Sequence, residues 1–221
     1  MKILVIDVGG THVKVQATGQ RARRKLPSGP GLTPRRMVRA VGDLVAGWSY
    51  EVITIGVPTR VRRDRIVAEP ANLGRGWVGY DFGRAFDLPV KLINDAAMQA
   101  LGVYEGGRML FLGLGTGLGT ALVVDGAIVP MELAHLPYKK GTYEDYVGLR
   151  GLQRNGKKKW RRDVADVVGR LAVALEAEDL VIGGGNSKFL KNLPKDARLG
   201  TNADAIKGGY RLWAERSGGH G

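Results

Sequence analysis

Apolar residues along this chain gather in short runs that are separated by polar segments and by segments with helical spacing. The runs short enough to be buried strands are 3–6, 52–57, 90–93, 109–112, 120–124 and 180–182. Apolar residues recur at intervals of three and four in 37–45 and 161–178, which predicts two amphipathic helices. The segment 96–105 could form a third helix. Strands that alternate with helices along the chain predict an α/β fold.

Turn signals divide these elements. Asp125-Gly126 stands between two apolar runs and predicts a two-residue hairpin. Residues 18–35 are rich in glycine, proline and arginine and are predicted to be a loop. Residues 151–162 are basic and contain glycine, so we expect an exposed segment there.

Two segments of the chain share one pattern, a strand followed by a Gly/Thr turn and a second strand. The first is VIDVGGTHVKVQATG at 5–19, and the second is FLGLGTGLGTALVVDG at 111–126. Such a turn exposes several backbone N–H groups at one point and lets an anion approach closely. Either turn alone could be a simple tight hairpin, but the pair indicates that the two turns face each other and hold one phosphate chain. Asp7 beside the first turn indicates Mg²⁺ bound partly through water, because Mg²⁺ keeps much of its hydration shell.

The charge balance narrows the class of partner. The 221 residues include 34 Lys+Arg against 21 Asp+Glu, a formal net charge of +13, which attracts polyanions. The basic clusters are either a solvated surface or a path for a long phosphate chain. They are Arg21, Arg23, Arg24 and Lys25; Arg35, Arg36 and Arg39; Arg60, Arg62, Arg63 and Arg65; and Lys157, Lys158, Lys159, Arg161 and Arg162.

The sequence lacks the features of disulfide-bonded, zinc-binding, membrane, secreted and DNA-binding proteins. The absence of cysteine excludes disulfides and a thiolate zinc site. No apolar run approaches the length of a membrane span, and the N-terminus lacks the features of a signal peptide, so we expect a cytoplasmic protein with no membrane partner. The chain starts directly at its first strand, which argues against a helix-turn-helix regulator and against nucleic acid as the partner.

Six segments, in order along the chain, resemble the motifs of the ROK sugar kinases in the actin/hexokinase superfamily. They are DVGGT with Lys14 at 7–14, ANLGRGW at 71–77, INDAAMQALG at 93–102, GLGTGLGTALVVDG at 113–126, ELAHL at 132–136 and LVIGGGNSK at 180–188. The resemblance implies phosphate binding by Gly9, Gly10, Thr11, Lys14, Gly115, Thr116 and Gly117. It implies nucleotide binding by Gly183, Gly184 and Gly185. It implies sugar binding by Asn72, Asn94, Asp95, Glu132, His135 and Glu144.

Asp95 is the implied catalytic base. A carboxylate within hydrogen-bond reach of a sugar hydroxyl can accept its proton as the bond to phosphorus forms. The alternative for Asp95 is a helix N-cap, since Asn94 and Asp95 precede the expected helix. The alternative for Lys14 is an exposed lysine on a strand.

The polyphosphate glucokinase branch of the family is the most similar. That branch also lacks the zinc-binding cysteines, it has a similar Val129-Pro130 before its Glu-Leu-Gly-His, and its second sugar-contacting glutamate corresponds to Glu144. The segments KKKWRR and TNADAIKGG resemble its later parts. Two differences are Ala134, where the motif has glycine, and a shorter chain.

The resemblance therefore implies a two-lobed, ribonuclease-H-like α/β fold with an interlobe cleft. We expect a first lobe over 1–93 with the first phosphate turn, and a second lobe over 94–221 with the second. A helix around 204–215 could pack back onto the first lobe. The expected activity is phosphorylation of glucose at O6 with Mg²⁺ and polyphosphate or ATP. Alternatives are an ATP-dependent kinase for another hexose or aminosugar and a non-catalytic regulator that binds a polyanion. A homodimer is compatible with the family.

Overall fold

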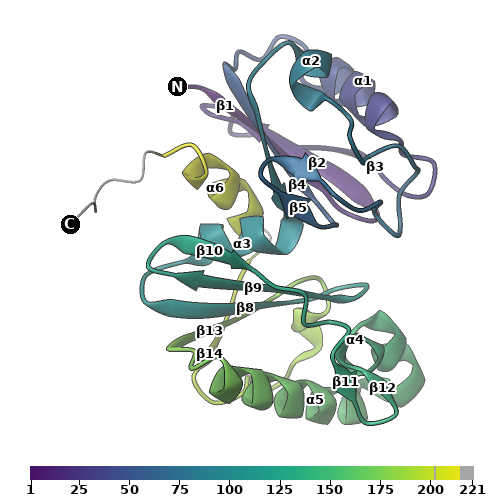
Figure 1. Cartoon of the computed structure of the whole chain (residues 1–221), viewed down its shortest axis with the longest axis vertical. Coiled ribbons are helices and arrows are strands. Elements are labelled where there is room, and N and C mark those ends of the chain that lie inside the picture. The colour runs from purple at the N-terminus through teal and green to yellow at the C-terminus, as the bar shows by residue number, and fades with distance from the viewer. Residues whose placement is uncertain (202, 215–221) are drawn as a thin grey trace. The chain divides into compact units, whose positions relative to one another are not determined.

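The computed structural model describes residues 1–201 and 203–214 as an α/β structure of two compact units. Among the described residues, the first unit contains Met1–Asp95 and 206–214, and the second contains the residues between them. Figure 1 shows that each unit is built around its own sheet. No helix in the described part of the chain is long and apolar enough to span a membrane.

The sheet of the first unit has five strands in the order β3-β2-β1-β4-β7. Their bounds are Arg24–Pro27 (β3), His12–Ala17 (β2), Ile3–Val8 (β1), Val52–Val57 (β4) and Val90–Asn94 (β7). The strands β1, β4 and β7 are parallel, whereas β2 and β3 are antiparallel to their neighbours. The carboxyl ends of β1, β4 and β7 therefore lie at one edge of the sheet.

The remaining elements of this unit are helices and a short hairpin. They are α1 (Pro34–Leu44), β5 (Val61–Arg62), β6 (Arg65–Ile66), α2 (Phe82–Phe86) and α6 (Asp204–Arg211), whose first two residues belong to the second unit. Thr33 caps α1 by accepting a hydrogen bond from the N–H of Arg36, and Pro34 provides the backbone angle that suits a first turn. The helix buries Met37 and Val41 against the sheet core.

The second unit also has a five-stranded sheet, in the order β10-β9-β8-β13-β14. Their bounds are Ala127–Pro130 (β10), Leu118–Val124 (β9), Arg108–Leu114 (β8), Asp179–Gly183 (β13) and Ala197–Leu199 (β14). Its other elements are α3 (Asp95–Val103), β11 (Pro137–Tyr138), β12 (Gly141–Thr142), α4 (Tyr143–Val147), α5 (Leu149–Ala174) and a 3-10 turn at Ser187–Phe189.

Alternation along β8 explains how both faces of this sheet are covered. Leu110, Leu112 and Leu114 pack in one cluster with the apolar face of α5. The other face lies against α3, where a Cβ on Gly119 would come within 2.8 Å of the Ala96 Cβ. The sheet is thus a middle layer between α3 and α5 (Figure 1).

The hydrophobic runs predicted as strands are confirmed, since each lies in or overlaps a strand of the two sheets. The predicted turn at Asp125-Gly126 is also confirmed: it joins β9 to β10, with φ of 48° and 76°.

The prediction of a loop over 18–35 was wrong in part. Within 18–35, residues Arg24–Pro27 form the edge strand β3, because their backbone pairs with β2 despite two charged side chains. Residues 151–162 lie within α5, and most of them are exposed, as predicted. Trp160 is fully buried there, and its Nε1–H donates a hydrogen bond of 2.8 Å to Val147 O. Gly156, one of the two glycines in this segment, introduces a kink within α5, with φ of 68°.

The segment that carries α6 is held tightly in the first unit. The Thr54 hydroxyl donates a hydrogen bond of 2.8 Å to Gly209 O and accepts one of 2.9 Å from Trp213 Nε1. The absence of a side chain at Gly209 allows this approach, because a Cβ there would lie 2.4 Å from Val5 Cγ1. Val5 is itself fully buried in β1.

We predict that Gly209→Ala lowers the free energy of unfolding by about 1–3 kcal/mol, the range for overpacking a filled core. Gly169→Ala is the matched control within a helix, because no atom of the described residues lies within 4 Å of a Cβ at Gly169. It should stabilise the protein by up to about 1 kcal/mol through helix propensity. Urea unfolding measures both variants, and equal stability of Gly209→Ala and the wild type would contradict the packing described here.

Candidate active site

The first predicted phosphate turn joins β1 to β2. The N–H of Gly9 donates a hydrogen bond of 3.0 Å to His12 O, which closes the turn, and a Cβ on Gly9 would lie 3.1 Å from that oxygen. Thr11 is exposed, with its Oγ1 3.2 Å from His12 Nδ1. The turn therefore leaves Gly10 and Thr11 as the part that a phosphate could reach.

Asp7 and Lys14 are cross-strand partners next to this turn. Lys14 Nζ lies 3.4 Å from Asp7 Oδ2, and Asp7 is only 7% exposed. Burial raises the pKa of Asp7, while the charges of Lys14 and Arg23 act in the opposite direction. Lys14 is thus neither a free surface lysine nor an isolated phosphate ligand, because it is paired with the buried carboxylate.

The fit of Mg²⁺ can be tested on these residues. A buried carboxylate whose pKa is raised by desolvation would gain from a further cation nearby. One protein carboxylate together with water and donor phosphates is a common set of ligands for Mg²⁺. No group of three His, Asp or Glu side chains within 1–201 and 203–214 offers a complete cage of protein ligands. Asp7 therefore suits a Mg²⁺ that arrives with its water and donor.

Asn72 lies next to the first turn. Its Cβ is 3.9 Å from the position that a Cβ on Gly10 would occupy. The loop around Asn72 is organised by Glu69, whose carboxylate accepts hydrogen bonds from the N–H groups of Gly76, Trp77 and Val78 at 3.1–3.2 Å. The sequence analysis missed Glu69. A single exposed glutamate in a sequence does not indicate that its carboxylate will accept three backbone hydrogen bonds from the loop that follows it.

Asn94 and Asp95 lie at the same sheet edge as Asp7. The register pairs Asp7 with Gly56 and Gly56 with Ile93, so Asp95 follows two residues beyond the level of Asp7. Asn94 ends β7, and its Nδ2–H donates a hydrogen bond of 3.2 Å to Thr59 O. Asp95 is the first residue of α3. The carboxyl edge of a parallel sheet is where α/β proteins commonly bind ligands.

The second predicted phosphate turn joins β8 to β9 and contacts Glu144. Glu144 Oε2 accepts a hydrogen bond of 3.3 Å from the N–H of Leu118. A Cβ on Gly117 would lie only 1.9 Å from this oxygen, so only glycine leaves room for the carboxylate. Arg150 Nη2 lies 3.5 Å from the other oxygen, Glu144 Oε1. The structure thus brings a predicted sugar ligand and a predicted phosphate turn together.

The third glycine segment packs on the same turn. A Cβ on Gly184, which has φ of 83°, would lie 2.4 Å from Leu114 O. The side chain of Asn186 donates a hydrogen bond of 2.8 Å to Gly115 O, and its backbone N–H donates one of 2.9 Å to Leu114 O. Gly183, Gly184 and Gly185 therefore adjoin Gly115, Thr116 and Gly117. Asn186 is a second contact that the sequence analysis did not single out, although it lies within the quoted motif.

Glu132 and His135 lie beside each other on the loop after β10. His135 Nδ1 is 3.4 Å from Glu132 Oε1, and their side chains are 70% and 52% exposed, respectively. Ala134 between them is 2% exposed and is not among the residues with positive φ. Replacement of the motif glycine by alanine therefore causes no backbone strain. The N–H of Glu144 donates a hydrogen bond of 3.0 Å to Ala134 O, which links this loop to Glu144.

The predicted site residues thus form two sets, one in each unit. Asp7, Gly9, Gly10, Thr11, Lys14, Asn72, Asn94 and Asp95 belong to the first unit, and the second unit holds Gly115, Thr116, Gly117, Glu132, His135, Glu144, Gly183, Gly184 and Gly185.

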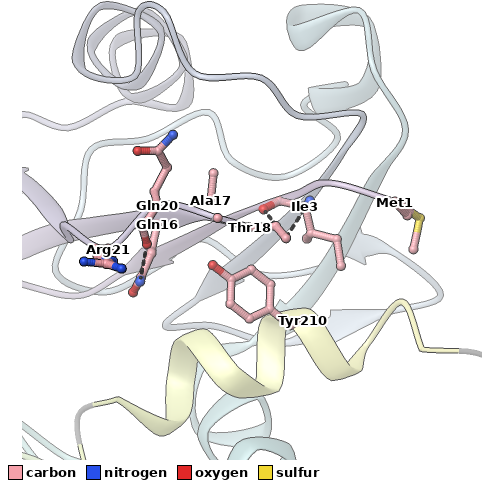
Figure 2. Close-up of a pocket in the computed structure, with 9 residues that line it drawn as sticks. Met1, Ile3, Gln16, Ala17, Thr18, Gln20, Arg21 and Tyr210 are labelled. Atoms are coloured by element: carbon pink, nitrogen blue, oxygen red, sulfur yellow. Dashed lines mark hydrogen bonds between the residues drawn. The ribbon is translucent and has the colours of Figure 1, made fainter.

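A hollow of about 510 Å³ lies elsewhere in the first unit (Figure 2). It is lined by residues that include Ile3, Gln16, Arg21 and Tyr210, at the end of the β1–β2 pair away from the glycine turn. Burial raises the pKa of Tyr210. No lining residue of this hollow belongs to the predicted site.

Comparison with known proteins identifies the family of this chain. The model of the ROK family matches residues 3–130. A polyphosphate glucokinase of Mycobacterium tuberculosis is 26% identical over 208 residues, which cover 83% of this chain and 77% of that protein.

Solved structures show the same fold. An inorganic polyphosphate/ATP-glucomannokinase from Arthrobacter sp. strain KM superposes with a TM-score of 0.81 at 24% identity, over 96% of this chain and 97% of the other. A ROK family glucokinase from Streptomyces griseus, in complex with glucose and AMPPNP, gives a TM-score of 0.74 at 17% identity, over 96% and 98% of the two chains. The family model covers more than half of the sequence. The chain therefore belongs to the ROK family, and its α/β structure is the actin/hexokinase-like fold of the sugar kinases.

Proposed function

We propose that this protein, a phosphotransferase of the ROK family, transfers a phosphoryl group from polyphosphate or ATP to O6 of glucose. The observation that carries the proposal is the common sheet edge in the first unit, where the first glycine turn follows β1 and Asp95 follows β7, two residues beyond the level of Asp7. The named activities of the similar proteins support glucose and polyphosphate. A cytoplasmic location stays a prediction.

Asp95 has the role of general base in this proposal. It accepts the proton of O6 as this oxygen attacks the terminal phosphorus of the donor. The O6–P bond forms while the bond from that phosphorus to the bridging oxygen breaks, so ADP or the shortened polyphosphate leaves and the sugar keeps the phosphoryl group. Phosphoryl transfer needs mainly positioning and neutralisation of charge. The backbone N–H groups of the two glycine turns provide donors for the donor phosphates, and Lys14 adds a positive charge. Mg²⁺ near Asp7 supplies charge neutralisation on those phosphates when it is bound.

Sugar binding is assigned to five polar side chains. Glu132, His135 and Glu144 provide acceptors and a donor for the hydroxyl groups, while Asn72 and Asn94 lie on the loop and strand next to Gly10 and Asp95. The Glu132–His135 contact of 3.4 Å orients both side chains before a sugar arrives. Mannose belongs in the substrate panel, because one similar structure is named a glucomannokinase.

The donor is assigned from charge. Three cations gather around Phe189, next to the third glycine segment: Lys157 Nζ lies 4.7 Å from the ring centroid, Lys188 Nζ lies 5.1 Å from it, and Arg161 Nε donates a hydrogen bond of 2.6 Å to Phe189 O. A chain of phosphates that continues past the glycine segments would meet these charges. The formal net charge of +13 supports polyphosphate as the better donor.

Asp95→Asn should reduce kcat about a hundredfold or more, because it keeps the size of the side chain and removes the base. Glucose binding should largely persist. A coupled glucose 6-phosphate assay with each donor separately measures the rate, and Asp87→Asn at the exposed left-handed end of α2 is the control. Near-normal turnover of Asp95→Asn would reject Asp95 as the base.

Glu132→Gln and His135→Ala should each raise the glucose KM far more than the KM of the donor, because both side chains are assigned to the sugar. Asp125→Asn, on the exposed turn of the same unit, should leave both constants unchanged. Steady-state kinetics with one substrate varied at a time decides this. An effect confined to the donor KM would overturn the sugar assignment.

Activity with long polyphosphate should fall steeply between low and moderate salt, since each contacted phosphate releases counterions. The ATP-driven rate should show a shallow dependence. Changing Lys157, Lys158 and Lys159 together to Ala should lower the polyphosphate rate and flatten its salt slope, and Lys157→Ala alone should account for more of the loss than the Lys158/Lys159 pair. Equal salt slopes for the two donors, or no rate with polyphosphate, would contradict this donor assignment.

A further inference from the structure

A small hairpin connects the two predicted sugar ligands His135 and Glu144. Its strands are β11 and β12, with Pro137 paired to Thr142 and Tyr138 paired to Gly141. The hairpin begins two residues after His135 and ends two residues before Glu144. At its base, the N–H of Tyr143 donates a hydrogen bond of 3.1 Å to Leu136 O. The placement of the hairpin therefore sets how His135 and Glu144 lie relative to each other.

The turn of this hairpin is formed by Lys139 and Lys140. Lys139 has φ of 54°, in the left-handed region where glycine and asparagine are favoured. A lysine in this conformation carries a backbone cost, which persists in a structure only where the surroundings compensate for it. The side chain of Lys139 provides the compensating contact.

Lys139 Nζ donates a hydrogen bond to Asp163 Oδ1 on α5, and this bond raises the pKa of Lys139. The Asp163 side chain is only 3% exposed, whereas that of Lys139 is 43% exposed. The other carboxylate oxygen of Asp163 is buried without a hydrogen-bond partner in the described part of the chain. A buried carboxylate destabilises the fold unless it is paired with a positive charge. Lys139 provides that charge for Asp163.

A second contact holds the hairpin on the same face of α5. The Tyr138 hydroxyl donates a hydrogen bond of 2.7 Å to Asp166 Oδ2, and Asp166 lies three residues after Asp163. Lys139 Nζ also lies 4.8 Å from the centre of the Tyr138 ring and 5.3 Å from that of Tyr146. The hairpin is thus fixed to α5 by an ion pair and a hydrogen bond, and the cation–π contact with Tyr146 joins it to α4.

We propose that Lys139 and Asp163 are positioning residues for sugar binding: their ion pair fixes the hairpin on α5 and so places His135 and Glu144. The inference rests on the proposed function for the identity of the ligand. Neither side chain needs to touch the sugar. Loss of the pair should misplace the two ligands by small distances, and small misplacements are sufficient to weaken binding strongly.

The test compares three variants of the full chain. Lys139→Met removes the cation, the double variant Lys139→Met/Asp163→Leu removes both charges and avoids an unpaired buried carboxylate, and Lys140→Met is the control on the exposed neighbour in the same turn. Lys139→Met and the double variant should each raise the glucose KM about tenfold, with the donor KM changed less than twofold. Lys140→Met should match the wild type in both constants.

Amide hydrogen exchange of Tyr143 and Glu144 provides a readout that does not depend on activity. Both amides donate backbone hydrogen bonds to the loop that carries His135, so Lys139→Met and the double variant should exchange them faster at unchanged rates in β8 and β13. If the wild type phosphorylates no sugar, the proposed function is refuted. Faster exchange in the two variants would then still support the positioning role of Lys139 and Asp163. Unchanged exchange, or a glucose KM equal to that of the wild type in the folded double variant, would overturn the positioning role.

Discussion

The structure of the second unit depends on glycine at positions where a neighbouring group occupies the space of a side chain. The Glu144 carboxylate occupies the volume that a side chain at Gly117 would fill, and the backbone of Leu114 does the same beside Gly184. Because these approaches are closer than any Cβ would permit, the turn, Glu144 and the third glycine segment form one contiguous structure. Glycine is needed here less for its own flexibility than for the neighbours that it admits.

Two buried carboxylates show how the fold uses charge. Asp7 in the first unit and Asp163 in the second are 7% and 2% exposed, and each is paired with one lysine that is only partly buried. A charge is removed from water at a considerable free-energy cost, so a single lysine compensates incompletely. For Asp7, burial outweighs the effect of Lys14, so the pKa of the carboxyl is raised. Asp7 lies next to the phosphate turn, where a further cation would stabilise its charged form. For Asp163, the uncompensated part remains as a carboxylate oxygen, Oδ2, that has no hydrogen-bond partner among the described residues. Asp163 lies in the helix that supports the hairpin between His135 and Glu144.

The named motifs explain only part of the site. Glu69, Asn186 and Arg150 each contact a predicted loop or ligand, yet none was assigned a role from the sequence. Glu69 holds three N–H groups of the loop after it, and Asn186 reaches a carbonyl 71 residues away. Such residues act on the backbone of a motif, and their contribution follows from distances that no local pattern records. Residues of this kind are where substitutions outside the motifs would alter the site.

The sequence by itself determined the strands with apolar runs (β1, β4, β7, β8, β9 and β13), the longer helices and the residues of the glycine turns. Short apolar runs and glycine turns are local signals, so β1, β4, β8 and the Asp125-Gly126 turn could be read directly, and the ordered motifs predicted the family. The tertiary structure alone decided which segments become neighbours. It made 24–27 an edge strand by pairing it with β2, made 151–162 a helix by burying Trp160, and joined α6 to β1 at Gly209. It also set the register that brings Asp7 level with Ile93, because strand pairing and close packing arise from contacts between residues far apart in the chain, which periodicity along the chain does not encode.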